Sequence, residues 1–398
     1  MAEHPLNYLI SLFLWTMKKV YLDSAATTQM RDEVIERMIA VMKENYGNPS
    51  SSHAFGRSSK SLIENARKTV AGYLNVSASE IIFTSGGTEA DNLALNSAVR
   101  DLGVKRIITS RIEHHAVLYT VSQLKECFDV QVDYVDLDEC GQIKPGHLEE
   151  LLKGSQLKTL VSLMHVNNEV GNLLDIHEIG KLCKEHNALF HCDTVQSIGH
   201  FELDLSVIPV DFTAVSAHKF HGPKGVGFAF IRKNSGLKPL IFGGEQERGQ
   251  RAGTESVHNI VGLEEALKLA YMNLEEERAY ITSLKDYFIA ELQDKIPGVK
   301  FNGDCTVAEK STYTLINVCL PVTQEKALML LFQLDLKGVA CSKGSACQSG
   351  SDKGSHVLNA FLSKEDLEKP SLRFSFSHYN TKEEIDYVIG VLKDFIES

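Results

Sequence analysis

Several chemically capable groups come directly after apolar, strand-like runs of the sequence. Lys219 follows DFTAVSAH, Asp193 ends ALFHCD, His114 follows TSRIE, and Gly87-Thr88 come after IIFTSG and open a helical pattern. The carboxyl ends of the strands in an open α/β sheet meet along one crevice, where such proteins bind their ligands. We therefore expect these positions to meet in one pocket.

Each of these groups could carry chemistry in such a pocket. A lysine amine that is partly removed from water can form a Schiff base, and glycines before a helix N-terminus let backbone N–H groups approach a phosphate. A buried carboxylate needs a partner, which a protonated pyridine nitrogen would supply. Taken singly, the groups also fit a solvated turn lysine, a helix-capping aspartate, an ordinary turn and a structural histidine. Together they predict a pyridoxal phosphate pocket.

The stretch VACSKGSACQSG places Cys341 and Cys347 among the small residues that are typical of a loop. A thiolate is a strong nucleophile, and a loop of small residues would let it move. The cysteines include no CxxC pair or zinc-ribbon spacing, and those on apolar elements, such as Cys183 and Cys319, are expected to be small buried hydrophobic residues. Cys341 is expected to be another, with a sulfur relay or a disulfide with Cys347 as the alternative.

Composition and charge narrow the class of protein. The 398 residues carry a formal net charge of −11, which argues against nucleic acid as the main partner, because binding a phosphate backbone needs clustered Lys and Arg. NYLISLFLWT (7–16) is apolar but shorter than the roughly 20 residues that span a bilayer, so no membrane partner is expected. Residues 1–16 are predicted to be a disordered or loosely packed extension, with a short interfacial anchor as the alternative. Because signal-peptide features are lacking and a free thiol is needed, we expect a cytoplasmic location.

Short β-rich runs alternate with amphipathic helical patterns such as 89–102 and 176–187 in the first two thirds of the chain. Several of these runs are apolar throughout, which favours strands buried on both faces of a mostly parallel sheet. The alternation predicts a large α/β domain over residues 31–270. The expected strands are 81–85, 106–110, 159–166, 188–193, 211–216 and 225–232.

The pattern changes after Val261. Residues 262–296 form one helical pattern that is too long for a compact helix without a bend. Strand-like runs at 311–320 and 371–377 follow, and the chain ends in another helical pattern. These segments predict a smaller α+β domain made of residues 17–30 and 271–398.

Taken in order, the motifs resemble cysteine desulfurases of the NifS/IscS type, which belong to the class V branch of fold-type I pyridoxal phosphate enzymes. The resemblance runs from VYLDSAATT (20–28) to the C-terminus. It implies an α/β fold with a large domain, whose mixed and mostly parallel sheet is flanked by helices, and a smaller α+β domain. The stretches that carry it are YGNPSSSHAFGR, FTSGGTEADNLAL, TSRIEHHAVL, MHVNNEVG, HCDTVQSIG, SAHKFHGPKGVG, ERGQRAGT, GSACQSG and SLRFSFS.

The resemblance implies a role for each matching residue. Lys219 would bind the cofactor covalently, His114 would lie against its ring, and Asp193 would pair with the ring nitrogen so that the ring acts as an electron sink. Arg373 would hold the substrate carboxylate, a task that suits a guanidinium. The other implied contacts are Gln196 and Asn168 to the phenolic oxygen, Asn168 also to the substrate, Gly87, Thr88, Ser216 and His218 to the phosphate, and Thr254 to the phosphate of the partner subunit in a homodimer.

The implied reaction converts L-cysteine to L-alanine. The substrate loses its α-proton, and the Cys347 thiolate attacks the substrate sulfur and becomes a persulfide. The loop resembles the longer housekeeping type, which implies that sulfur passes to an iron–sulfur scaffold protein or a tRNA-thiolation protein. Thr194-Val195 departs from the small-residue pair that is more usual in the family, which puts the packing of the ring in doubt.

Other functions stay open at this point. A selenocysteine lyase or another class V enzyme would share Lys219 and Asp193. A non-catalytic protein with a degenerate site is disfavoured by the full set of cofactor residues. No metal is expected, since HxxxH and HExxH spacings are missing. A metal-dependent hydrolase would have to draw its ligands from His114, His115, His191, Asp193, His218 and His221.

Overall fold

The computed structural model describes residues 18–343 and 354–397. Its centre is a seven-stranded sheet with the strand order β2-β8-β7-β6-β5-β3-β4. Strand β8 runs antiparallel to both of its neighbours, and the other pairs are parallel. The strands are β2 (Ile81–Thr84), β3 (Arg106–Thr109), β4 (Gln131–Tyr134), β5 (Thr159–Ser162), β6 (Leu189–Asp193), β7 (Phe212–Ser216) and β8 (Gly227–Ile231).

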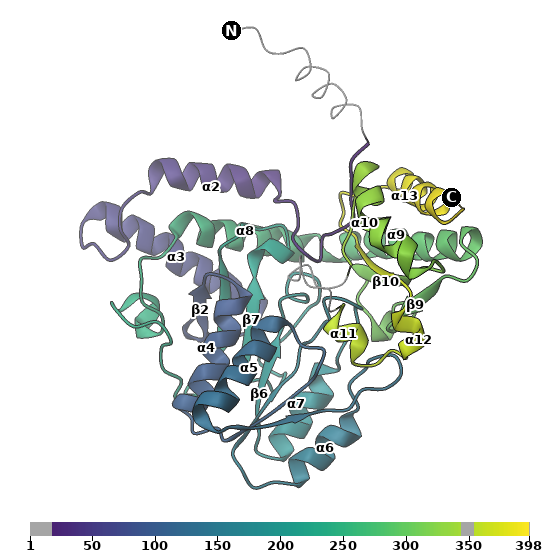
Figure 1. The fold of residues 1–398 in the computed structure, drawn as a ribbon. Helices are drawn as coiled ribbons and strands as arrows, with labels where there is room; N and C mark the ends of the chain where they lie inside the picture. The colour runs from purple at the N-terminus through teal and green to yellow at the C-terminus, as the bar shows by residue number, and fades with distance from the viewer. Residues whose placement is uncertain (1–17, 344–353, 398) are drawn as a thin grey trace, which may run out of the picture.

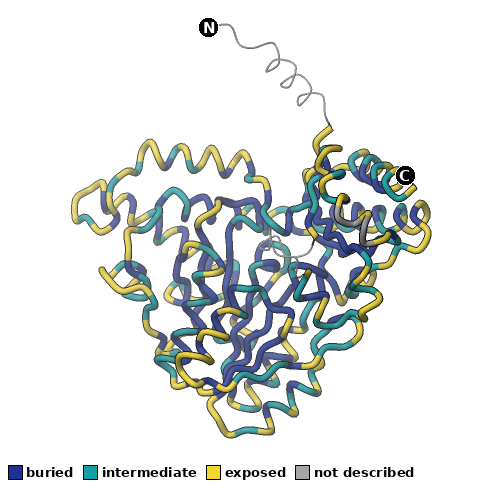
Figure 2. Tube along the Cα trace, in the orientation of Figure 1, coloured by how far each residue is buried: buried dark blue, intermediate teal, exposed yellow. Residues whose placement is uncertain are grey.

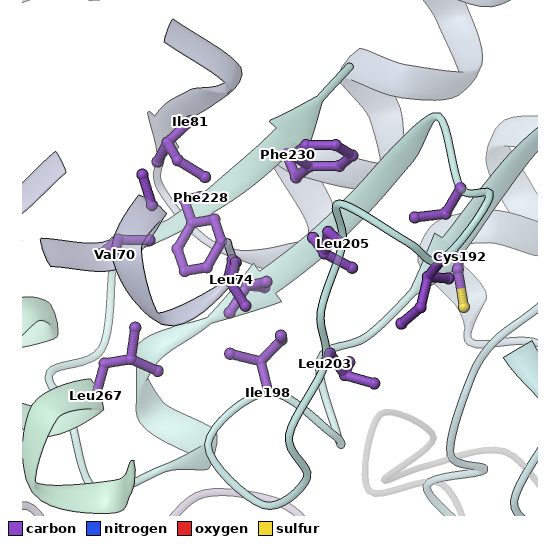
Figure 3. Close-up of a cluster of buried hydrophobic side chains, with 14 of the residues drawn as sticks. Val70, Leu74, Ile81, Cys192, Ile198, Leu203, Leu205, Phe228, Phe230 and Leu267 are labelled. Carbon is purple, nitrogen blue, oxygen red and sulfur yellow. The ribbon is translucent and has the colours of Figure 1, made fainter. Parts of the chain in front are cut away.

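Helices cover both faces of this sheet (Figure 1). Successive strand residues point to opposite faces. Ile82 and Ala229 pack with residues of α4 and α5, whereas Phe83, Phe228 and Phe230 pack with residues of α3 and α8. Figure 3 shows part of the cluster that includes Phe228 and Phe230. The helices are α2 (Asp32–Glu44), α3 (Ala54–Tyr73), α4 (Gly87–Arg100), α5 (His115–Phe128), α6 (Pro145–Lys153), α7 (Ile176–Glu185) and α8 (Val257–Met272).

Burial on both faces explains the apolar strands of the sequence, and Figure 2 shows the sheet as the most buried part of the chain. The predicted α/β class, with a mixed and mostly parallel sheet between helices, is therefore confirmed. No helix in the described ranges is long and apolar enough to cross a bilayer.

A second hydrophobic cluster joins Val20 and Leu22 to residues between Ile281 and Leu392. It includes residues of the antiparallel sheet β12-β10-β9, and β1 pairs with β11 in parallel. The domain limits given above stay a prediction, and residues 1–16 lie outside the described residues. The elements here are β1 (Val20–Tyr21), α9 (Leu274–Lys295), β9 (Lys300–Asn302), β10 (Leu315–Cys319), α10 (Gln324–Leu336), β11 (Val339–Ala340), α11 (His356–Asn359), α12 (Lys364–Leu367), β12 (Ser371–Ser375) and α13 (Lys382–Glu397).

Two of the expected elements take a more specific form in the structure. The long helical pattern divides into α8 and α9 at Asn273, which provides the expected bend. The expected strand 159–166 ends at Ser162. Shortly after it, the side-chain oxygen of Asn167 accepts hydrogen bonds from the N–H groups of Glu169 and Val170, and this turn places the intervening Asn168 at the sheet edge.

Candidate active site

A cavity of about 510 Å³ lies at the carboxyl ends of β6 and β7 and at the N-terminus of α4. The lining residues come from chain segments between Ala25 and Arg373. Twelve residues are implied by the resemblance to act in catalysis or to bind cofactor or substrate; ten of them line this cavity, Thr254 does not, and Cys347 lies outside the described residues. Those that line it are Gly87, Thr88, His114, Asn168, Asp193, Gln196, Ser216, His218, Lys219 and Arg373.

Lys219 ends a short 3₁₀ helix, Ala217–Lys219, that directly follows β7. Its Nζ donates hydrogen bonds to the carbonyl oxygens of Ala25, at 2.6 Å, and Ala26, at 2.8 Å. Gln196 Nε2 donates to the same Ala25 oxygen at 2.9 Å. The segment after β1 therefore closes one wall of the cavity and holds the amine in place.

Asp193 is the last residue of β6, and its side chain is buried at the cavity wall. Its Oδ1 accepts a hydrogen bond from the backbone N–H of Val195 at 2.9 Å. Burial, with a further contribution from the nearby Asp91, raises the pKa of Asp193 to about 7. A cation brought into the cavity would favour the charged form of this carboxylate.

His114 is the N-cap residue of α5, and its Nδ1 accepts a hydrogen bond from the N–H of Ala116 at 3.1 Å. Burial, with smaller contributions from the amine of Lys219 and neighbouring histidines, lowers the pKa of His114 to about 4. The ring is therefore neutral at pH 7, and the Nδ1 contact assigns its proton to Nε2. The cavity wall thus contains a flat, uncharged ring.

The N-terminus of α4 forms a cradle in which a larger side chain would not fit. Gly86 has a φ of 149°, a conformation that glycine tolerates, and a Cβ on Gly87 would lie 2.5 Å from Val195 Cγ2. The first N–H groups of a helix have no partner within the helix and attract anions. With Ser216 and His218, which also line the cavity, this set of donors fits a phosphate group.

Glu89, in the first turn of α4, is a carboxylate beside this cradle, and it is paired. Glu89 accepts a hydrogen bond from the N–H of Ser85 at 2.8 Å and forms an ion pair with Arg251, also at 2.8 Å. The guanidinium lowers the pKa of Glu89 against the opposing effect of burial. The pair leaves little net charge to repel a phosphate.

Arg373 lies on β12 with its guanidinium buried in the cavity wall. Its Nη1 donates to the Asn168 carbonyl at 2.7 Å, and its Nη2 donates to Asp23 Oδ1 at 2.8 Å. Ser342 Oγ donates to the same Asp23 oxygen at 2.7 Å. Arg373 Nε is buried and has no hydrogen-bond partner among the described residues, so a donor remains for a bound carboxylate.

Asp91 on α4 is an ionisable lining residue that was missed in the sequence. Its Oδ1 lies 3.3 Å from His191 Nε2, and His191 Nδ1 lies 2.9 Å from Ser162 Oγ. Burial raises the pKa of Asp91 to about 8 and lowers that of His191 to about 4. A signal was available, because Asp91 comes three residues after Thr88 and therefore shares its face of the helix.

Four other named residues of the described ranges, Thr254, Cys183, Cys319 and Cys341, do not line this cavity. Thr254 is exposed and does not line it. Cys341 directly follows β11 and packs, partly buried, against the second cluster. Burial raises the pKa of its thiol to about 12, which agrees with the expected small hydrophobic role, and Cys183 and Cys319 are buried. Within the described ranges, no three His, Cys, Asp or Glu side chains gather as metal ligands.

The family model for class-V aminotransferases matches residues 20–388. The chain belongs to this family. Cysteine desulfurase IscS from Dictyoglomus turgidum is 42% identical over 382 residues, which cover 96% of this chain and 95% of that protein.

Solved structures of similar proteins support the same family assignment. A NifS-like protein superposes with a TM-score of 0.86 at 35% identity, over 96% of this chain and 100% of that one. SspA, solved in complex with cysteine, has a TM-score of 0.78 at 31% identity, over 91% of this chain and 100% of that one. The resemblance to the NifS/IscS type of cysteine desulfurase is therefore confirmed.

Proposed function

We propose that this class V enzyme is a pyridoxal phosphate-dependent cysteine desulfurase, which converts L-cysteine to L-alanine and transfers the sulfur to Cys347. The observation that carries the proposal is the single cavity in which Lys219, Asp193, His114 and Arg373 meet. The comparisons favour this activity over the selenocysteine lyase alternative, since the named relatives are cysteine desulfurases.

The cavity fits the cofactor of this family. Lys219 would hold it through its amine, the α4 N-terminus with Ser216 and His218 would hold its phosphate, and Asp193 would face its ring nitrogen. When bound, pyridoxal phosphate supplies an electron sink for the negative charge left on the substrate α-carbon. The raised pKa of Asp193 agrees with a carboxylate that ionises fully only opposite a cation.

Arg373 would bind the carboxylate of L-cysteine. Asp23 and the Asn168 carbonyl fix the plane of its guanidinium through Nη2 and Nη1. Because these contacts leave Nε without a partner among the described residues, a substrate carboxylate would satisfy a buried donor. This gain favours amino acids over simple amines, because an amine leaves that donor unpaired.

The proton steps would use groups that the fold holds close to the cavity. Lys219 is a basic amine at the carboxyl end of β7 that lines the pocket, and it would take the α-proton of the substrate. His114 is neutral at pH 7 because of its lowered pKa, and with Nδ1 engaged by Ala116 its Nε2–H is free to donate. Asp193 and His114 would provide one charged and one uncharged contact to the ring of the bound cofactor.

Cys347 would be the nucleophile that takes the substrate sulfur as a persulfide. The proposal rests on the motif GSACQSG and on the unsuitability of Cys341, whose raised pKa leaves almost no thiolate at pH 7. The sulfur would then pass to an acceptor protein, either an iron–sulfur scaffold or a tRNA-thiolation protein. A free thiol nucleophile needs a reducing compartment, so we place the enzyme in the cytoplasm.

The enzyme would act as a homodimer. Thr254 is exposed and lies outside the cavity of its own chain, which suits a residue that completes the phosphate cradle of a partner subunit. The outer face of α2 exposes Ile35, Ile39 and Met42, and such clustered apolar side chains favour an interface. Both features support pairing of two copies with Thr254 near the shared surface.

The test is product formation from L-cysteine with a thiol reductant, after the visible spectrum has been recorded. A yellow wild-type protein should release alanine and sulfide, and Cys347→Ser should keep the colour but lose both products. A yellow Cys347→Ser variant with full activity would contradict the proposed nucleophile. A colourless wild-type protein would contradict the cofactor.

A further inference from the structure

A groove of about 700 Å³ runs along the surface between α10 and α13, and it shares no lining residue with the active-site cavity. Apolar side chains from both helices line much of it, namely Met329, Leu334, Tyr387, Val391 and Phe395, and the polar side chains of Lys326, Gln333, Lys337 and Asp394 complete the lining. Met329 is 48% exposed in spite of its apolar character. The proposed desulfurase chemistry does not use this surface.

The two helices run antiparallel along the groove and fix its ends. At one end, Tyr387 Oη donates a hydrogen bond to the Lys337 carbonyl at 2.8 Å. At the other end, Lys326 Nζ lies 3.4 Å from the Ile396 carbonyl oxygen. Between Tyr387 and Phe395 the α13 backbone rises by about 12 Å, at 1.5 Å per residue.

The first described residue lies at the mouth of this groove. Lys18 Nζ donates to the Glu383 carbonyl at 2.8 Å and lies 5.0 Å from the centre of the Tyr387 ring. Two residues later, Val20 is held in the β1–β11 pair, and Figure 1 shows this start of the described chain, in purple, beside α10. The chain that precedes Lys18 therefore joins the protein at the Tyr387 end of the groove.

The preceding sequence suits an apolar groove. NYLISLFLWT (7–16) contains Leu, Ile, Phe, Trp and Tyr and no charged residue, and exposure of such side chains to water is unfavourable. Ten residues span about 15 Å as a helix and more if extended, which is enough to reach the far end. One residue, Met17, separates this run from Lys18.

We propose that residues 7–16 bind in the groove between α10 and α13 of the same chain. The short tether gives the segment an effective concentration at the groove on the order of millimolar. The tethered segment therefore competes well with a separate partner for this groove. Binding covers Met329 and the apolar run at the same time. This role does not depend on the desulfurase activity.

The single tryptophan of the chain, Trp15, provides a direct probe. In the full-length holoenzyme, its emission should be blue-shifted and protected from acrylamide, and both properties should vanish in denaturant. The test variant is Met329→Asp, which places a charge in the groove. The matched control is Phe332→Asp, because Phe332 is an exposed apolar residue of the same helix that does not line the groove.

The proposal expects Met329→Asp to move the emission to longer wavelength and to raise acrylamide quenching severalfold, while Phe332→Asp leaves both unchanged. Met329→Asp should also lower the thermal stability of the full-length enzyme. In a chain that lacks residues 1–16, the same substitution should lower it much less. Trp15 quenched as strongly in the native enzyme as in denaturant would overturn the proposal. Protection that disappears on dilution would also overturn it, because the occupant would then come from a second copy.

Discussion

Asp91 Oδ1 lies 3.3 Å from His191 Nε2 at the wall of the cavity that also contains Asp193. Both atoms are buried, and neither Asp91 Oδ1 nor His191 Nε2 forms a hydrogen bond of good geometry with any described residue, including each other. Two carboxylates in one buried cavity do not both ionise readily, because each disfavours the charge of the other. We expect Asp91 to keep its proton and donate it towards His191, which leaves the negative charge to Asp193.

Asp91→Asn should therefore change stability in a pH-dependent way. The folded-state pKa of Asp91 is about 8, against an ordinary value of 3.8, so the folded chain keeps a proton that the unfolded chain releases between these values. The free energy of unfolding of the wild type should fall across this window, by at most about 1.4 kcal/mol per pH unit. Asn carries no such proton, so the variant should gain stability over the wild type as the pH rises.

Urea unfolding of the cofactor-free protein between about pH 5 and pH 8 checks this expectation. Asp294→Asn is the matched control, since Asp294 is exposed on α9, and its difference from the wild type should stay flat. The pH dependence of the visible band of the holoenzyme should also be preserved in Asp91→Asn. A flat stability difference would mean that Asp91 is ionised in the folded protein.

Thr254 leads to a prediction for mixed dimers. Lys219→Ala removes the amine of one cavity, and Thr254→Ala removes the hydroxyl that we assign to the cavity of the partner. In a heterodimer of the two variants, one site combines the intact Lys219 of the Thr254→Ala subunit with the intact Thr254 of the Lys219→Ala subunit. Mixing two poorly active homodimers should therefore restore up to about half of the wild-type activity per dimer.

Subunit exchange, followed by affinity purification of heterodimers that carry two different tags, measures this recovery. If Thr254 served its own subunit, no site in the heterodimer would be intact and activity would stay at the level of the parents. Mixing Lys219→Ala with itself under two tags controls for the exchange procedure. A fully active monomer would contradict the arrangement from the start.

The sequence predicted the residues at strand ends better than the contacts between distant segments. Asp193 and Lys219 were found because an apolar strand that ends in a polar residue is a local pattern. The pair of Arg373 with Asp23 joins positions 350 residues apart, and no local pattern indicates it. The pair forms only when β12 and the segment after β1 meet across the second cluster.

The contacts that hold the segment before Thr254 could not be predicted from the sequence either. Glu247 and Arg248 adopt φ values of 47° and 58°, which are unfavourable for residues with side chains. Glu247 accepts hydrogen bonds from Arg67 Nη1 and Nη2, at 2.6 and 2.9 Å, and from the N–H of Phe83 at 2.9 Å. These contacts hold a strained turn that propensity alone would not predict.

Glu247→Gln should lower stability strongly. It leaves the guanidinium of Arg67 without its buried counter-charge, and loss of one partner from a buried pair costs about 3–5 kcal/mol. Glu64→Gln is the matched control, because Glu64 also contacts Arg67, at 3.1 Å, but is partly exposed, and its loss should stay below about 1 kcal/mol. Denaturant unfolding of both variants measures the two values, and equal losses would show that the buried pair has no special weight.

Cys341 and Cys347 should respond in opposite ways to substitution. Burial, with the nearby Asp23 charge, raises the pKa of Cys341 to about 12, so less than about one part in ten thousand is thiolate at pH 7. Cys341→Ala should therefore retain activity within about twofold and lower stability modestly, by about 1 kcal/mol for the lost packing. Alanine release and persulfide labelling measure the effect, with Cys347→Ser as the inactive control. A tenfold loss of sulfide release in Cys341→Ala, with alanine release intact, would instead assign Cys341 to a sulfur relay.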